Sequence, residues 1–189
     1  MLKFQTLSIE AAPKASQAIL QNVQKATGFL PNLLGTMALS PALLEAYVTL
    51  TSIFGKTNLS ETERQIILMT NNRLNGCAYC MAAHTTISLM ANVPSSVIDS
   101  LRNNTPIADP KLEALRTFAG VINETRGWPS SEQVTAFCAA GYDHQTVLEV
   151  ILGTSLKVMS NYTNHVAQTE VDQAFQGNAW KPSKEIQPA

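Results

Sequence analysis

The sequence predicts an all-α fold of roughly eight to ten helices in a single domain that spans residues 1–189. Helix-start signals recur along the chain, and the apolar side chains between them follow helical spacing. No segment keeps the alternating β-branched pattern of a strand for more than a few residues. A hydrophobic content of 45% is ample for the core of one such domain.

The helices of the first half are predicted from their caps. Residues 13–25 are expected to be helical, and GFLPNLLG reads as a loop with a helical turn. Ser40 and Pro41 form an N-cap and a first-turn proline, so a helix should follow them. Ser60 to Glu63 has the form of a capping box, and the helix that it opens should end at Gly76, because glycine tolerates a left-handed C-terminal cap.

The second half continues in the same way. Asp109 and Pro110 open one helix, Ser130 begins a second capping-box form, and Asp143 caps a long segment of apolar residues at helical spacing. The predicted helices are residues 77–91, 95–102, 110–127, 130–141 and the long segment after 143, with a terminal turn or two at 169–175.

Charge and hydropathy exclude several classes of partner. Thirteen basic and fourteen acidic side chains leave a net charge of −1, without the basic stripe that follows a phosphate backbone. No apolar run approaches the length of a membrane span, and the first residues lack the hydrophobic region of a secretory signal. We therefore expect a cytoplasmic protein that binds neither nucleic acid nor membrane.

The stretch NGCAYCMAAH contains two of the three cysteines and carries the candidate chemistry. At about 100° per residue, Cys77, Cys80 and His84 fall within about 60° of one helix face. A helix N-terminus lowers the pKa of a thiol, so one cysteine should be a nucleophilic thiolate. Its attack on a peroxide leaves a sulfenic acid, with which a second thiol one turn away can condense. His84 is placed to take and return the proton.

Two other interpretations of this stretch remain open. The cysteines can be buried apolar residues, although the chain uses cysteine sparingly. They can also hold zinc, with Cys138, His144 or His165 completing the ligands, but tetrahedral sites usually place the C-x-x-C on a tight turn. Of the three interpretations we favour the redox pair, and we expect no metal ion.

The stretch LSETERQIILMTNNRLNGCAYCMAAHT resembles the core motif of the carboxymuconolactone decarboxylase and AhpD-like alkylhydroperoxidase family. The shared features are S-x-x-E, Arg73, the Asn75-Gly76 break, Tyr79 and Ala83-His84 within residues 60–92. LPNLLGTMALSPALLEAY and NYTNHVAQTEVD are similar to the flanks of the family's peroxidase-related branch, so the likeness extends over most of the chain.

The resemblance implies an AhpD-like helical fold, a trimer or hexamer, no bound cofactor, and thiol-dependent reduction of hydroperoxides. It implies that Cys80 is the attacking thiol, that Cys77 is the more accessible resolving thiol, and that His84 belongs to a proton relay. An external thiol or dithiol would then reduce the disulfide. Tyr79 and His165, the latter near the end of the long helix, are further candidates for the relay or for support of the site.

One position departs from the family pattern. Gln65 stands where the family has its relay glutamate, and an amide orients a group by hydrogen bonding but cannot accept a proton. Glu61 lies one helical turn away and Glu63 about 200° around the helix, so neither is a clean substitute. Two alternatives to a peroxidase therefore remain: a decarboxylase-type enzyme that needs no thiols, and a non-catalytic redox sensor or assembly module.

Overall fold

The computed structural model describes residues 4–182, and within them all regular structure is helical, as predicted. The chain folds into nine α-helices and one 3₁₀ helix over these residues: α1 (Lys14–Thr27), α2 (Asn32–Met37), α3 (Pro41–Phe54), α4 (Glu61–Leu74), α5 (Ala78–Met90), α6 (Ser95–Asn103), α7 (Pro110–Glu124), α8 (Ser131–Ala139), α9 (His144–Ala167) and η1 (Gln173–Asn178).

The predicted caps are present. Ser60 and Ser130 each form a complete capping box, and Asp109 and Asp143 accept hydrogen bonds from the first turns of their helices. The terminal turn is a 3₁₀ helix that begins at Gln173, a few residues later than the sequence indicated. The local signals were therefore sufficient to place most of the helix starts.

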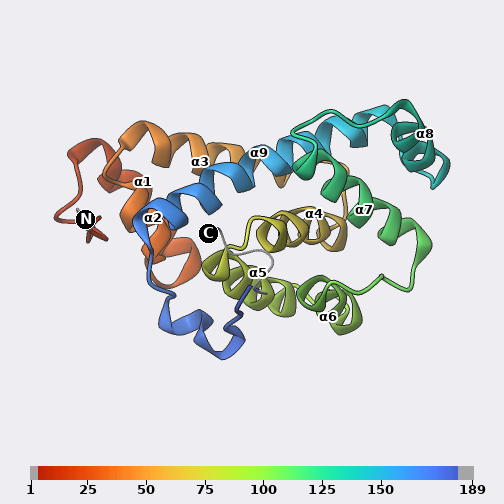
Figure 1. The fold of residues 1–189 in the computed structure, drawn as a ribbon. Coiled ribbons are helices and arrows are strands. Elements are labelled where there is room, and N and C mark those ends of the chain that lie inside the picture. The colour runs from red at the N-terminus through yellow and green to blue at the C-terminus, as the bar shows by residue number, and fades with distance from the viewer. Residues whose placement is uncertain (1–3, 183–189) are drawn as a thin grey trace.

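Helix α4 lies at the centre of the fold and contacts α5, α6, α7 and α9 (Figure 1). All eight residues from Gln65 to Asn72 are buried, because helices pack around most of its circumference. The long helix α9 crosses the molecule beside α3 and α4 (Figure 1). This arrangement places side chains of α9 opposite the start of α5.

A close approach at Gly153 sets the distance of α9 from α4 and α3. A Cβ at this position would lie 2.7 Å from Cγ2 of Ile67 and 2.9 Å from Cζ of Phe54. Such distances are shorter than real carbon contacts, so only glycine fits without displacement of its neighbours.

The core is divided into two clusters. The larger one packs α4 against α6, α7, α8 and α9, and the smaller one packs α1, α2, α3 and α5 against Phe175 of η1. Both Cys77 and Cys80 belong to the smaller cluster. The chemistry predicted from the sequence is therefore enclosed by the N-terminal helices and the C-terminal segment.

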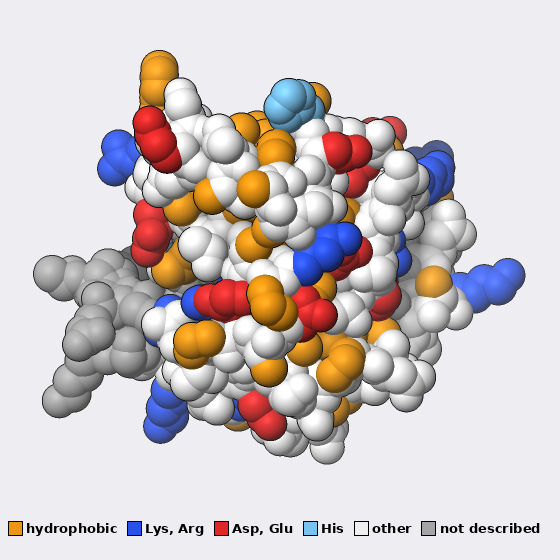
Figure 2. Space-filling model, turned by 90° about the vertical axis from the view of Figure 1, so that its right-hand side faces the viewer, with side chains coloured by type: hydrophobic (Ala, Val, Ile, Leu, Met, Phe, Trp, Pro, Cys, Tyr) orange, Lys and Arg blue, Asp and Glu red, His pale blue; other side chains and the backbone are white. Residues whose placement is uncertain are grey.

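The surface near α7 and α8 carries acidic and basic side chains interspersed with hydrophobic ones (Figure 2). On this face no large area of a single charge gathers. None of the helices within residues 4–182 combines the length and the apolar character that crossing a bilayer requires.

Candidate thiol redox site

The turn between α4 and α5 positions both cysteines. Gly76 adopts φ 66°, in the left-handed region that glycine favours, and the N–H of Cys77 donates to the carbonyl of Asn72 at 2.9 Å. Cys77 is consequently the N-cap of α5 and Cys80 lies in its first turn. The two sulfurs face α9, where Asn164 Nδ2 lies 3.2 Å from Cys80 Sγ and 3.8 Å from Cys77 Sγ.

The pKa values of the two thiols are shifted in opposite directions. Burial raises the pKa of Cys80, but the hydrogen bond from Cys77 and the positive charge of Lys157 outweigh burial and lower it below its ordinary value. The pKa of Cys77 is raised, first because its thiol hydrogen-bonds to Cys80 and second because of burial. The site therefore favours a thiolate at Cys80 and a thiol proton at Cys77.

His84 lies between two polar partners. Its Nδ1 is 2.9 Å from Oε1 of Gln65, and its Nε2 is 3.0 Å from Nζ of Lys157. Burial, followed by the positive charge of Lys157, holds the pKa of His84 well below its ordinary value, so the imidazole is neutral. His84 thus contacts Gln65 through one ring nitrogen and Lys157 through the other, and neither contact was predicted from the sequence.

Sequence reasoning missed the polar residues that α9 contributes. Lys157, Ser160, Asn161 and Asn164 recur at i, i+3, i+4 and i+7, and all four are buried. They form one helical face turned toward the cysteines, with Asn161 donating to Asn72 of α4 at 3.0 Å. The signal was present in the sequence as a polar stripe on an otherwise apolar helix.

A small apolar cavity of about 110 Å³ lies beside Cys80. Cys80, His84 and Lys157 line it together with apolar and aromatic side chains. The aromatic ones are Tyr47, Tyr79 and Phe175. A substrate in this cavity would meet a sulfur, an imidazole and an ammonium group on otherwise apolar walls.

The expectation that Cys77 is the more accessible thiol is wrong. Cys77 is 1% exposed and Cys80 is 2% exposed, and of the two only Cys80 lines the cavity. The reason is the turn at Gly76, which folds the N-cap residue inward against Asn164.

Tyr79 and His165 occupy different places relative to the thiols. The ring of Tyr79 lines the cavity, but its hydroxyl donates to Asp172 Oδ2 at 2.5 Å and accepts from the N–H of Leu33 at 3.2 Å. Burial and then Asp172 raise its pKa, so the hydroxyl retains its proton. His165 is exposed and its ring lies against Tyr162, while its neighbour Asn164 contacts the sulfurs.

The residues invoked for zinc are separated from the pair. His144 is exposed at the start of α9, and Cys138 is half-buried on α8. Within residues 4–182, no group of three or more His, Cys, Asp or Glu side chains is arranged to hold a metal ion.

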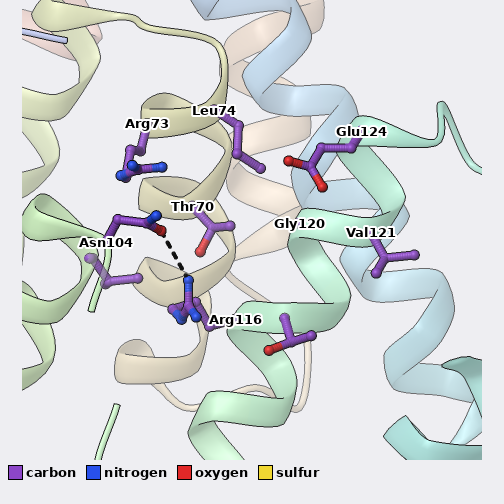
Figure 3. A pocket seen from close by; sticks show the side chains of 10 residues that line it. Thr70, Arg73, Leu74, Asn104, Arg116, Gly120, Val121 and Glu124 are labelled. Carbon is purple, nitrogen blue, oxygen red and sulfur yellow. Dashed lines mark hydrogen bonds between the residues drawn. The ribbon is translucent and has the colours of Figure 1, made fainter. Parts of the chain in front are cut away.

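A larger cavity of about 420 Å³ lies between α4, α6 and α7, and its lining contains neither cysteine nor histidine (Figure 3). Arg116 in its wall donates to Asn104 Oδ1 at 3.3 Å and forms two hydrogen bonds with Glu113 at 2.6 and 2.8 Å. The charge of Arg116 is therefore compensated, and the lining offers no thiol or imidazole group. We place the candidate chemistry at the smaller cavity.

Fold and site together define an all-helical protein with a paired-cysteine site at the start of a helix. Residues 41–119 match the model of the carboxymuconolactone decarboxylase family. The matched segment contains helices α3 to α6 and most of α7, and it includes both cysteines of the pair, so this part of the chain is similar to that family. Comparison with curated proteins finds no match to the sequence.

Solved structures share the fold along nearly the whole chain. A peroxidase-related protein with an AhpD core from Ralstonia eutropha JMP134 is 20% identical over 95% of this chain and 97% of its own, with a TM-score of 0.81. A peroxidase-related protein from Silicibacter sp. TM1040 is 18% identical over 93% and 95%, with a TM-score of 0.80. A variant of the debrominase Bmp8 in complex with 2,3,4-tribromopyrrole is 17% identical over 99% and 98%, with a TM-score of 0.78.

Proposed function

We propose that the protein is a thiol-dependent hydroperoxide reductase in which Cys80 attacks the peroxide and Cys77 resolves the product. The observation that carries this proposal is the asymmetry of the pair. Cys80 has the lowered pKa and lines the cavity, whereas Cys77 has the raised pKa and retains a proton. One sulfur is thus suited to nucleophilic attack and the other to the second step.

The reaction needs two steps at the sulfurs. The Cys80 thiolate attacks the outer oxygen of the hydroperoxide, the O–O bond breaks, and the products are a sulfenic acid and an alkoxide that takes up a proton. The Cys77 sulfur then attacks the sulfenic sulfur, and its thiol proton leaves with the hydroxide as water. An external dithiol reduces the resulting disulfide and restores both cysteines.

The first test is a count of free thiols before and after one equivalent of an organic hydroperoxide is added to the reduced protein. We expect the loss of two thiols per chain, assigned by mass spectrometry to Cys77 and Cys80 and reversed by a dithiol. Cys80→Ser should abolish peroxide consumption, and Cys77→Ser should stop at the sulfenic acid.

Cys138→Ser is the matched control, because Cys138 lies on α8 outside the site. It should leave both the peroxide-dependent thiol loss and turnover unchanged. If all thiols persist after peroxide, or if Cys80→Ser still consumes it, the peroxidase proposal is wrong.

Reductive debromination is a second candidate, favoured by the aromatic lining of the cavity next to Cys80. The Cys80 thiolate would take the bromine of an aryl bromide, the Cys77 thiol would supply the proton to carbon, and formation of the disulfide would release bromide. Incubation of the reduced protein with 2,3,4-tribromopyrrole tests this candidate. Stoichiometric bromide release that Cys80→Ser abolishes would support it, and no release would exclude it for this compound.

A further inference from the structure

Lys157 is the most unusual residue of the site. Its side chain is 1% exposed, yet its hydrogen-bond partner is the neutral imidazole of His84 and not a carboxylate. Burial of an ammonium group is costly unless a negative charge compensates it. The negative charge available in this cavity is the thiolate of Cys80, whose pKa Lys157 helps to lower.

The hydrogen bonds on the other side of His84 have a fixed direction. Oε1 of Glu61 lies 2.7 Å from Nε2 of Gln65, and a carboxylate can only accept, so the amide of Gln65 must donate there. Its oxygen therefore faces His84, and Nδ1 of His84 must carry the proton that this oxygen accepts. The lone pair of Nε2 is left for the ammonium of Lys157.

We propose that Lys157 is a catalytic residue of the proposed peroxide reduction, pairing its ammonium with the Cys80 thiolate and protonating the departing alkoxide. Gln65 and Glu61 are positioning residues, since they act by holding His84 in the tautomer that accepts from Lys157.

The protons balance in this scheme. The Cys80 thiolate and the Lys157 ammonium react with one hydroperoxide to give a sulfenic acid, an alcohol and a neutral Lys157 amine. The Cys77 thiol then condenses with the sulfenic acid and releases water. When an external dithiol has reduced the disulfide, the new Cys80 thiol transfers its proton to the amine, which regenerates the ion pair.

His84 is less suited than Lys157 to donate this proton. The imidazole is neutral because of burial and the neighbouring ammonium, and the proton that it does carry, on Nδ1, is engaged by Gln65. Lys157 carries three protons on Nζ, which lies 3.0 Å from His84 Nε2, and Lys157 lines the cavity together with Cys80. The proposed role of His84 is thus to orient the ammonium group.

Two substitutions separate charge from proton donation. Lys157→Met removes both, while Lys157→Arg retains a positive charge on a group that does not give up its proton in proteins. Lys111→Met is the matched control, because Lys111 lies over the ring of Tyr142 in the other core cluster. For each variant, alkylation of Cys80 by iodoacetamide is followed against pH by peptide mass spectrometry, alongside hydroperoxide consumption.

Lys157→Met should move the alkylation profile of Cys80 to higher pH, and at any pH below the pKa values of both proteins the rate should fall about tenfold for each unit by which the pKa of Cys80 rises. It should also reduce hydroperoxide consumption by about 100-fold or more. Lys157→Arg should keep the alkylation profile near that of the wild type but still lose peroxide consumption. Lys111→Met should change neither measurement, and Lys157→Gln replaces Lys157→Met if circular dichroism shows that the latter does not fold.

Unchanged alkylation and turnover in Lys157→Met would overturn the proposal, and full turnover in Lys157→Arg would overturn proton donation. The proposal rests on the proposed peroxidase function only for the measurement of hydroperoxide consumption, and the alkylation of Cys80 does not depend on that function. If the wild type consumes no hydroperoxide, the function fails, whereas the alkylation profiles still decide whether Lys157 stabilises the thiolate.

Discussion

Asn164→Leu tests the amide that contacts the Cys80 sulfur directly. The substitution removes a donor 3.2 Å from Cys80 Sγ and replaces it with a side chain of similar size, at a position that is 5% exposed. A hydrogen bond to a charged group contributes about 1.5–3 kcal/mol, and one pKa unit corresponds to about 1.4 kcal/mol. Loss of the amide should therefore raise the pKa of the Cys80 thiol by about 1–2 units.

The assay is the rate of iodoacetamide alkylation of Cys80 as a function of pH, measured in a Cys138→Ser background. Because only the thiolate reacts, the wild-type rate should fall as the pH drops through the lowered pKa of Cys80. In Asn164→Leu this fall should occur at higher pH, with the same limiting rate in alkali. Superimposable profiles would show that Asn164 contributes only to packing, and the reasoning from the amide contact would be wrong.

Three further substitutions test the surroundings of the site. Gln65→Glu should raise the pKa of His84, because a carboxylate beside Nδ1 favours the imidazolium. NMR titration of the His84 ring measures this pKa, and the same pKa in both proteins would mean that the contact with residue 65 is absent in solution. In the wild type, His84 is neutral in the folded protein and takes up a proton more readily in the unfolded chain. The free energy of unfolding should therefore fall as the pH drops below about 6.5. Gln65→Glu should make this dependence on pH weaker. Gly153→Ala should lower the free energy of unfolding, measured in urea, by about 1–3 kcal/mol. The control is Gly120→Ala, where the nearest atom is 3.8 Å from the added Cβ, and it should leave stability unchanged or raise it. Equal effects of the two substitutions would exclude the close approach at Gly153 as the cause. Tyr79→Phe should lower the free energy of unfolding by about 1.5–3 kcal/mol, because it removes the hydrogen bond to Asp172. An unchanged urea midpoint would contradict a stabilising role of this hydrogen bond.

The helices were predictable because their signals are local. Ser60 with Glu63 and Ser130 with Gln133 satisfy the first backbone N–H groups of their own helices, and this needs no information from the rest of the chain. That Cys80 and His84 line one cavity agrees with their helical spacing at i and i+4. What the sequence did not provide was the orientation of the N-cap, which buries Cys77.

Local signals did not indicate which part of the chain α9 would contact. In the sequence, Lys157 lies 77 residues and Asn164 lies 84 residues after Cys80. Only the packing of α9 against α4 and α5 brings their side chains to the Cys80 sulfur. A lysine on a helix is ordinarily a solvated residue, so its presence alone indicated nothing. The stripe of polar residues at i, i+3, i+4 and i+7 was informative, because such a face on an apolar helix must either reach solvent or find buried partners.

The presence of Gln65 where the family motif has glutamate is consistent with the presence of Lys157. With Gln65, the enclosed site contains one ammonium and one thiolate, and the imidazole between the amide and the lysine is neutral. A carboxylate at position 65, beside His84, would add a second negative charge in a region of low dielectric, where the imidazole would have to take up a proton to restore neutrality. That proton would place an imidazolium 3.0 Å from the Lys157 ammonium, and the two positive charges would repel. An amide at position 65 avoids this conflict while its oxygen still accepts a hydrogen bond from His84 Nδ1, so glutamine at this position is compatible with a proton supplied by Lys157.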